Sequence, residues 1–473
     1  MVLAFAVSRL LFQPVSLGVS TFNFSGHLAS RAVDAISGNH FNGASLGDGM
    51  PILDRELLSN DLWRSLWYLH SQPPLFNLFV ATILRVPGNF NQNYQWISWA
   101  LALTLYLTTY VLLRRLKISR IMAAIAVVLF MLNPNAMWME SAVYYGLPLA
   151  LLLVLAALAW ERAMGYGSTL WLLLAAVLVV VLPLTRAFFN SLWCAAILLF
   201  FGAAFASRYG LSRRVIAATV IPFLVVIALQ TKQWIIFHQF LGSSWFGCNL
   251  ATMTASMSSE KSRELAVGKV SPLVKVYRNA PPADFLRYFR VEPTGIPALD
   301  QLRKSTGQPN FNHVVYLVVG RVYLRDTLYL IEHYPHKYLL NVLNSLYIFS
   351  GYQIGIYFDY PRRFFPRWSW SELAAPFVGF PLLVLALWTG WRRLRSDRRA
   401  SPVIVFLLST IVYVIAVSCL FEKSEGPIYR YQVDAFLWLF LAMGAESQVP
   451  ILIRRFQFLR WRPIAASPTD VRN

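Results

Sequence analysis

Apolar stretches about as long as a bilayer is thick recur along this 473-residue chain. A helix rises ~1.5 Å per residue, so about 20 apolar residues cross a hydrocarbon core ~30 Å thick. Only 14% of the residues are charged, whereas a soluble chain has about a quarter. The chain is therefore not soluble, disordered, collagen-like or a disulfide scaffold, and we expect an all-α polytopic membrane protein. Ten stretches qualify, at about 2–20, 95–113, 121–137, 143–160, 169–185, 188–205, 214–231, 375–391, 402–420 and 430–447.

The charge balance predicts how these stretches are oriented. Lys and Arg number 42 against 22 Asp and Glu, a net charge of +20. In a soluble protein this would indicate nucleic acid, but here the basic residues cluster between apolar stretches, as in cytoplasmic loops of membrane proteins. With all clusters inside, both chain ends are cytoplasmic, and we expect no nucleic-acid partner. The clusters lie at 114–117, 208–214, 392–399 and 454–462.

The connections divide the chain into three parts. Residues 73–86 are apolar but too short to cross, so Pro73-Pro74 is expected to open an interfacial or re-entrant helix. This topology gives two large extracytoplasmic regions that contain interfacial helices. With a candidate extra membrane helix, we expect about 10–13 transmembrane helices in total. The three parts are an N-terminal module with a long first outer loop, a large outer region, and C-terminal helices with a basic tail. Their bounds are 1–231 (outer loop 21–94), 232–374 (extra helix 337–358) and 375–473.

Acidic residues in the outer loops are the first candidates for chemistry. Asp48 and Asp54 lie in the first outer loop, and Glu140 follows an outer turn. Asp54 begins an amphipathic stretch, 54–69, whose tryptophans suit the headgroup zone. Asp54 is either a simple N-cap of that helix or a reactive carboxylate. Acids within or against membrane spans are costly, and they are functional candidates by default.

Polar side chains interrupt the apolar sequence at three further places. His70 and Gln72 stand at a corner before Pro73, Tyr144 follows the second outer turn, and Asn249 lies in a Gly-Ser-rich outer segment. A helix corner alone explains the first place. The alternative is that His70 and Gln72 point into a cavity. The three cysteines are far apart and show neither metal-ligand spacing nor a disulfide pattern.

Three cations lie at outer ends of spans, against the orientation rule. They are Arg186, Lys232 and Arg430. Singly, each is explained as a snorkelling anchor. Together with two acidic outer loops they suit an anionic ligand, because Arg can bind phosphate with two donors and Lys provides a point charge.

An acid in a long first outer loop, a His70-Ser71-Gln72-Pro73-Pro74-Leu75 corner and a second acidic turn resemble the GT-C superfamily of polyprenyl-phosphate-sugar-dependent membrane glycosyltransferases. Protein mannosyltransferases and lipid A aminoarabinose transferases belong to it, and the corner resembles their HPPL element. The adjacent pair of acids common in the superfamily is absent here. The resemblance implies a GT-C-like bundle in the cytoplasmic (inner) membrane, with its active site facing the outside or periplasm.

The resemblance also implies roles for the candidates. The donor would be a sugar on a polyprenyl phosphate, and the acceptor a lipid, glycan or protein; membrane lipids surround the chain. Asp54 or Asp48 would be the general base, and Glu140 would orient the acceptor or hold Mg²⁺ or Mn²⁺ with Asp54. Arg186, Lys232 or Arg430 would bind the phosphate. The sugar site would be lined by His70, Gln72, Tyr144 and Asn249.

A transporter or lipid flippase is the alternative function, because it too needs a cationic cavity for a lipid phosphate. Internal repeats, short outer loops and charges deep in several spans would indicate it. The chain instead has two large outer regions and few charges within its apolar stretches. The sequence therefore favours the enzyme.

Overall fold

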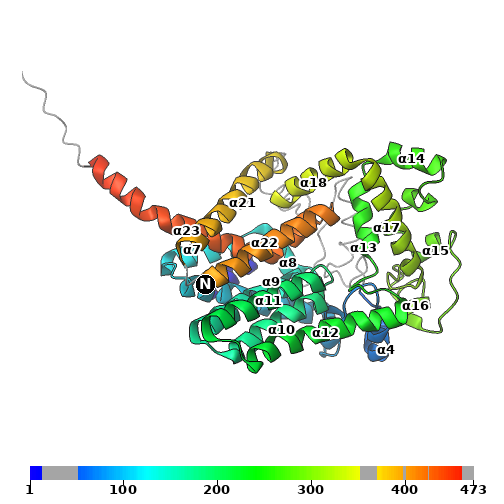
Figure 1. Ribbon diagram of the computed structural model, residues 1–473, viewed down its shortest axis with the longest axis horizontal. Coiled ribbons are helices and arrows are strands. Elements are labelled where there is room, and N and C mark those ends of the chain that lie inside the picture. The colour runs from blue at the N-terminus through cyan, green and yellow to red at the C-terminus, as the bar shows by residue number, and fades with distance from the viewer. Residues whose placement is uncertain (13–51, 352–369, 398–400, 424, 461–473) are drawn as a thin grey trace, which may run out of the picture.

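A computed structural model describes residues 1–12, 52–351, 370–397, 401–423 and 425–460. Within these ranges the regular elements are helices, apart from one isolated bridge between Arg303 and Pro309. Figure 1 shows long helices forming a bundle, with short helices from the outer region gathered at one end of it. The coarse prediction of an all-α fold is confirmed for this part of the chain.

Helices of 8 to 35 residues make up the bundle. They are α1 (Val2–Phe12), α6 (Phe90–Arg115), α7 (Arg120–Met131), α8 (Pro134–Ser141), α9 (Gly146–Tyr166), α10 (Thr169–Thr185), α11 (Ser191–Tyr209), α12 (Arg213–Phe237), α21 (Trp370–Ser396), α22 (Ser401–Phe421) and α23 (Gly426–Arg460). The last of these is 35 residues long, and its C-terminal part extends away from the other helices (Figure 1).

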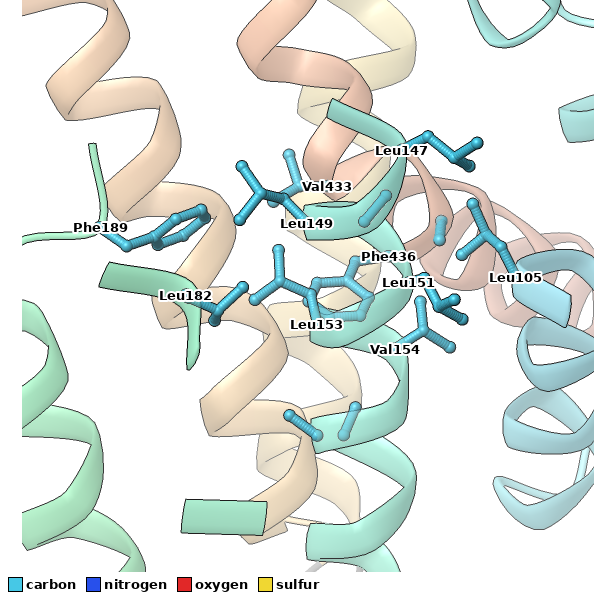
Figure 2. Close-up of a cluster of buried hydrophobic side chains, with 14 of the residues drawn as sticks. Leu105, Leu147, Leu149, Leu151, Leu153, Val154, Leu182, Phe189, Val433 and Phe436 are labelled. Atoms are coloured by element: carbon cyan, nitrogen blue, oxygen red, sulfur yellow. The ribbon is translucent and has the colours of Figure 1, made fainter. Parts of the chain in front are cut away.

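The hydrophobic core surrounds α9. Leu149 and Leu153 of this helix lie among side chains of α10 and α23 in Figure 2, including Leu182 and Phe436. Peripheral helices differ: Leu192 and Leu199 of α11 are more than 70% exposed. Large apolar side chains exposed along a long helix need an apolar solvent. The pattern is compatible with lipid around α11 and a protein core around α9.

Among the described residues, five helices are long and apolar enough to cross a membrane: α6, α9, α11, α12 and α22. They correspond to five of the ten predicted spans. The 17-residue α10 is shorter. Predicted spans 375–391 and 430–447 fall within α21 and α23. Of the predicted span 2–20, only α1 lies in the described part, so the expected total of 10–13 stays a prediction.

The predicted span at 121–137 is wrong as a continuous helix. The α7 helix ends at Met131, and α8 begins at Pro134. Proline lacks the backbone N–H that would continue the helix. The Asn133 side chain also accepts a hydrogen bond from the backbone N–H of Asn135, at 3.0 Å, which starts α8 separately.

Two predictions about the first outer loop have different outcomes. The short helix opened by Pro73-Pro74 is confirmed as α5 (Pro74–Leu84), with proline in its first turn. The single helix over 54–69 is wrong: it is two six-residue helices, α3 (Arg55–Asn60) and α4 (Leu62–Trp67), separated at Asp61. The predicted amphipathic character is nevertheless present in these short helices, because Leu58 and Leu62 are buried while Trp63 is exposed.

The outer region consists of short helices packed on α17 (Val315–His333). They are α13 (Phe246–Leu250), η1 (Ala251–Thr254), α14 (Ser258–Ala266), η2 (Pro272–Lys275), α15 (Pro282–Phe285) and α16 (Pro297–Asp300). Gly247 of α13 lies directly against Gly320 of α17, and a Cβ on Gly247 would overlap the Gly320 carbonyl oxygen. The α18 helix (Pro335–Ser350) coincides with the first part of the predicted extra helix at 337–358, and the part beyond residue 351 lies outside the described residues.

Candidate functional site

A small pocket lies where α5 begins. The N-cap residue of α5, Pro73, makes no side-chain cap hydrogen bond to the first turn of this helix. The side chain of Asn77 accepts a 2.8 Å hydrogen bond from the backbone N–H of Leu53, which ties the start of the first outer loop to this turn. The pocket is lined by Ile52, Gln72, Phe76, Asn77, Tyr145 and Thr185. The predicted sugar-site residue Gln72 therefore faces a pocket, and its Oε1 is buried without a partner among the described residues.

Arg186 stands directly after the pocket residue Thr185, where α10 ends. Its guanidinium donates to the hydroxyl oxygens of Tyr144 at 3.0 Å and Tyr429 at 2.9 Å. It also lies 3.7 Å from the ring centroid of Tyr145, a second pocket residue. This contact orients the planar cation and adds cation–π attraction. The predicted cation Arg186 and the predicted Tyr144 are thus brought together behind one wall of the pocket.

Two glutamates between α22 and α23 extend this arrangement. The Glu425 carboxylate accepts from Arg186 Nη2 at 3.4 Å and from the Tyr144 hydroxyl at 3.3 Å. The Glu422 carboxylate accepts from Arg278 of the outer region at 3.2 Å. Arg278 Nη1 also donates to the Asn249 side-chain oxygen at 3.0 Å. We call Arg186, Arg278, Glu422 and Glu425 the arginine–glutamate cluster.

Burial and charge act in opposite directions on Arg278. Burial alone would lower the pKa of this guanidinium, but Glu422 and Glu425 raise it above its ordinary value. Glu425 therefore acts on both arginines, because it accepts a hydrogen bond from Arg186 and raises the pKa of Arg278. Sequence reasoning had no signal for Arg278, which belongs to no motif.

Asp54 is the N-cap of α3, as one of the two sequence interpretations held. Its carboxylate accepts from the backbone N–H of Glu56 at 3.3 Å. It also accepts from the backbone N–H and the hydroxyl of Ser305, at 2.7 and 2.6 Å. Asp54 is buried and lies two residues from the pocket residue Ile52. The other candidate base, Asp48, lies outside the described residues.

His70 is buried at the corner and neutral. Its Nδ1 lies 2.7 Å from the Ser244 hydroxyl, and its backbone N–H donates to the Asn312 side chain at 2.9 Å. Burial, together with the positive charge of Lys232, lowers the pKa of His70 to about 3. The Nε2 atom is buried with no hydrogen-bond partner in the part of the chain that the structure covers.

Lys232 and Arg430 contact backbone carbonyls at helix ends. Lys232 Nζ donates to the carbonyl oxygens of Trp67 at 2.7 Å and Leu69 at 3.4 Å, just where α4 ends. Arg430 donates to Asp434 at 3.1 Å and to the carbonyls of Phe349 and Ser350, where α18 ends. Carbonyls at a helix C-terminus attract cations. These contacts hold the two helices in place.

Glu140 forms a buried ion pair that sequence reasoning missed. Its carboxylate accepts from both Nε and Nη2 of Arg9, the former at 2.6 Å, and from the Tyr106 hydroxyl at 2.6 Å. The pair fastens α1 to α6 and α8. In the described ranges no group of three or more His, Cys, Asp or Glu side chains is placed to hold a metal ion. The expected Asp54–Glu140 metal pair therefore gains no support from the structure.

Comparison of the chain with models of protein families, with curated proteins and with solved structures found no match.

Proposed function

We propose that this protein is a membrane glycosyltransferase that moves a sugar from a polyprenyl phosphate to an acceptor hydroxyl at the extracytoplasmic face, with inversion. The proposal joins the GT-C resemblance of the first outer loop to one observation: a pocket walled by Gln72, Tyr145 and Thr185 and backed by the buried cation Arg186. Unlike Arg9 and Arg430, which pair with internal carboxylates away from the pocket, Arg186 stacks on the pocket residue Tyr145 and suits an anion bound there.

Arg186 is the residue we assign to the donor phosphate. Negative charge grows on that phosphate as the bond to the sugar breaks, and a fixed cation there lowers the barrier. The stacking on Tyr145 keeps the guanidinium in one orientation before the donor arrives. Lys232 and Arg430 take positioning roles instead, since carbonyls of α4 and α18 occupy them.

Asp54 is the residue we assign as general base. A base must lie within hydrogen-bond reach of the hydroxyl that it deprotonates, and the Ser305 hydroxyl already donates to Asp54 at 2.6 Å. In the transferring enzyme the acceptor hydroxyl takes the place of Ser305. One base suffices for a single displacement with inversion. Glu140 is left out of the reaction because Arg9 and Tyr106 engage its carboxylate.

The sugar site, in this proposal, surrounds Gln72. Its amide group supplies the hydrogen bonds that a sugar hydroxyl needs, and Asn77 lies beside it in the pocket. His70 and Asn249 act indirectly in this proposal. His70 fixes the corner through its contact with Ser244, and Asn249 positions Arg278.

The test is transfer by purified protein in nanodiscs. A panel of polyprenyl-phosphate sugars with a radioactive sugar is supplied with an envelope extract as acceptor, and release of polyprenyl phosphate is measured together with labelled acceptor. We expect both with the wild type and neither with Asp54→Asn. Asp61→Asn is the matched control, because this acid lies seven residues further along the same loop and makes no side-chain cap contact.

Three outcomes would change the proposal. If Asp54→Asn stays active and Asp48→Asn does not, Asp48 is the base. If neither substitution matters, the enzyme assignment fails. If the intact lipid-linked sugar crosses the bilayer of a proteoliposome and no polyprenyl phosphate is released, the protein is a flippase.

A further inference from the structure

The arginine–glutamate cluster joins three distant parts of the chain. Arg186 ends α10 in the bundle, Arg278 lies between η2 and α15 in the outer region, and both glutamates lie between α22 and α23. Arg186 is buried, and Arg278 is mostly buried, with 14% of its side chain exposed. Each is paired with a carboxylate of the same short connection. Only Arg186 has a place in the proposed function so far.

Both ion pairs are looser than such pairs usually are. Charge-assisted N–H···O hydrogen bonds are about 2.7–2.9 Å long. Arg186 lies 3.4 Å from Glu425, and the two donors of Arg278 lie 3.2 and 3.5 Å from the oxygens of Glu422. The contact between Arg9 and Glu140 is much closer, at 2.6 Å from Nε. The glutamates therefore balance the charge of the arginines, but their hydrogen bonds to them are long.

Buried guanidinium groups need negative charge at all times, because an unpaired buried charge is costly. Two carboxylates supply two negative charges here. A phosphate monoester carries about −1.5 to −2 near pH 7 and offers three acceptor oxygens, which suits the planar forks of two arginines. It can therefore replace both carboxylates charge for charge, whereas a phosphodiester carries only one negative charge.

We propose that Arg186 and Arg278 together bind the phosphate monoester of a polyprenyl phosphate, and that Glu422 and Glu425 are internal counter-ions that hold these arginines until the phosphate takes their place. The lipid carrier in this inference rests on the proposed function. The arginine pair and its preference for a doubly charged phosphate rest on the contacts above.

The second arginine has a clear role in the reaction. The sugar-charged donor is a phosphodiester with one negative charge, which Arg186 can balance. The bond between the sugar anomeric carbon and the phosphate oxygen breaks, its electron pair stays on that oxygen, and the second charge appears there. The acceptor oxygen forms the new bond to the anomeric carbon, and its proton passes to Asp54. Arg278 receives the second charge, so the site binds the leaving polyprenyl phosphate more strongly than the donor.

Equilibrium binding tests this inference without any transfer. Radiolabelled polyprenyl phosphate is bound to the full chain in neutral phosphatidylcholine nanodiscs, with unlabelled competitors. We expect polyprenyl phosphate to compete at least tenfold better than the sugar-charged diester or the uncharged polyprenol. Millimolar inorganic phosphate is also tested as a competitor. If it displaces polyprenyl phosphate, the site recognises the phosphate group alone; if it does not, the site needs the lipid as well.

Substitutions assign the residues. We expect Arg278→Gln to weaken binding of polyprenyl phosphate at least tenfold, and Arg278→Lys to weaken it severalfold, because lysine keeps the charge but not the fork. Glu425→Gln should tighten binding severalfold, because it removes a competing carboxylate that is 25% exposed. Arg287→Gln and Glu292→Gln are matched controls, since both side chains are exposed in the same outer region. A cooperative thermal unfolding transition shows that each variant is folded. If Arg278→Gln does not fold, Arg278→Lys is used for the test.

The inference is overturned if polyprenol or the sugar-charged diester competes as well as polyprenyl phosphate, or if both Arg278 variants bind like the wild type. Its failure is distinct from that of the proposed function. Binding that depends on Arg278, in a protein that transfers no sugar, refutes only the transferase. Transfer that proceeds unchanged in Arg278→Gln, with unchanged product binding, refutes only the two-arginine site.

Discussion

At the scale of single residues, the buried polar side chains divide by what they contact. Lys232 and Arg430 bind carbonyls at helix ends, Glu140 pairs with Arg9, and Asp54 caps α3. Arg186 differs, because aromatic rings and hydroxyl groups surround it beside a pocket and its carboxylate partner lies at 3.4 Å. This is why we place the chemistry at Arg186 rather than at the other two outer cations.

Replacement of Arg186 by lysine separates its geometry from its charge. Arg186→Lys keeps a cation but loses the fork that reaches Tyr144 and Tyr429 and the stacking on Tyr145. We expect kcat/KM for sugar transfer to fall about 100-fold, the effect of roughly 2.7 kcal/mol of lost transition-state stabilisation. Steady-state kinetics with a fixed acceptor measure it. A change of less than twofold would show that Arg186 does not contact the donor.

The contact between Ser305 and Asp54 leads to a second prediction. Ser305→Ala removes the hydroxyl that competes with an acceptor for the Asp54 carboxylate, while the backbone N–H of residue 305 still donates. We expect KM for the acceptor to fall severalfold with little change in kcat. Ser259→Ala is the control, because that hydroxyl contacts Glu260 in a different part of the outer region. An unchanged KM would argue against acceptor binding at Asp54.

His70 predicts a pH dependence of stability. Its pKa in the folded protein is about 3, against about 6.5 when unfolded, so the unfolded state takes up a proton first as the pH falls. The contribution of neutral His70 to the free energy of unfolding is therefore fully present above about pH 6.5 and decreases as the pH falls from there to about 3. The loss by pH 5 is about 2 kcal/mol. Unfolding at pH 7 and 5 should show it, and His70→Asn, which retains a group at the Nδ1 position, should lose less stability over the same interval.

At the scale of elements, the sequence predicted features that depend on neighbouring residues, but not contacts between distant residues. The proline pair before α5, the cap of α3 and the five long apolar helices follow from neighbouring residues. The breaks at Asn133 and Asp61 were missed because apolar periodicity continues across both. Arg278 and Glu422 are 144 positions apart, and Asp54 and Ser305 are 251 apart. No spacing rule connects such pairs, so Arg278, Glu422 and Ser305 are known as neighbours of the site from the fold alone.

The crossing of α13 and α17 is an element contact that can be tested directly. A Cβ on Gly247 would overlap the carbonyl oxygen of Gly320, and the backbone cannot yield as a flexible side chain would. We expect Gly247→Ala to destabilise the outer region by about 3 kcal/mol and to lower the yield of folded protein. Gly202→Ala is the control, because a Cβ there meets Thr219 at an ordinary 3.6 Å and alanine favours the helix. Equal yields of the two variants would contradict this packing.

At the scale of the whole molecule, the charge distribution and the fold agree on a division into two ends. The basic clusters at 114–117 and 208–214 lie at one end of the bundle helices, after α6 and around the start of α12. The outer region follows the opposite end of α12, and the arginine–glutamate cluster lies where that region meets α10, α22 and α23. From these positions the positive-inside rule predicts that the outer region, and the site with it, lies on the extracytoplasmic face.

This orientation is tested by labelling with a thiol reagent that does not cross membranes. The native Cys194, Cys248 and Cys419 are free but buried, so background labelling should be low. Arg287→Cys places a thiol on an exposed site of the outer region, and Ser396→Cys places one at the exposed, basic end of α21. We expect the first to be labelled in intact cells and the second only after the cells are broken. If Ser396→Cys is labelled in intact cells and Arg287→Cys is not, the bundle is inverted, the site faces the cytoplasm, and the donor must be sought on that side.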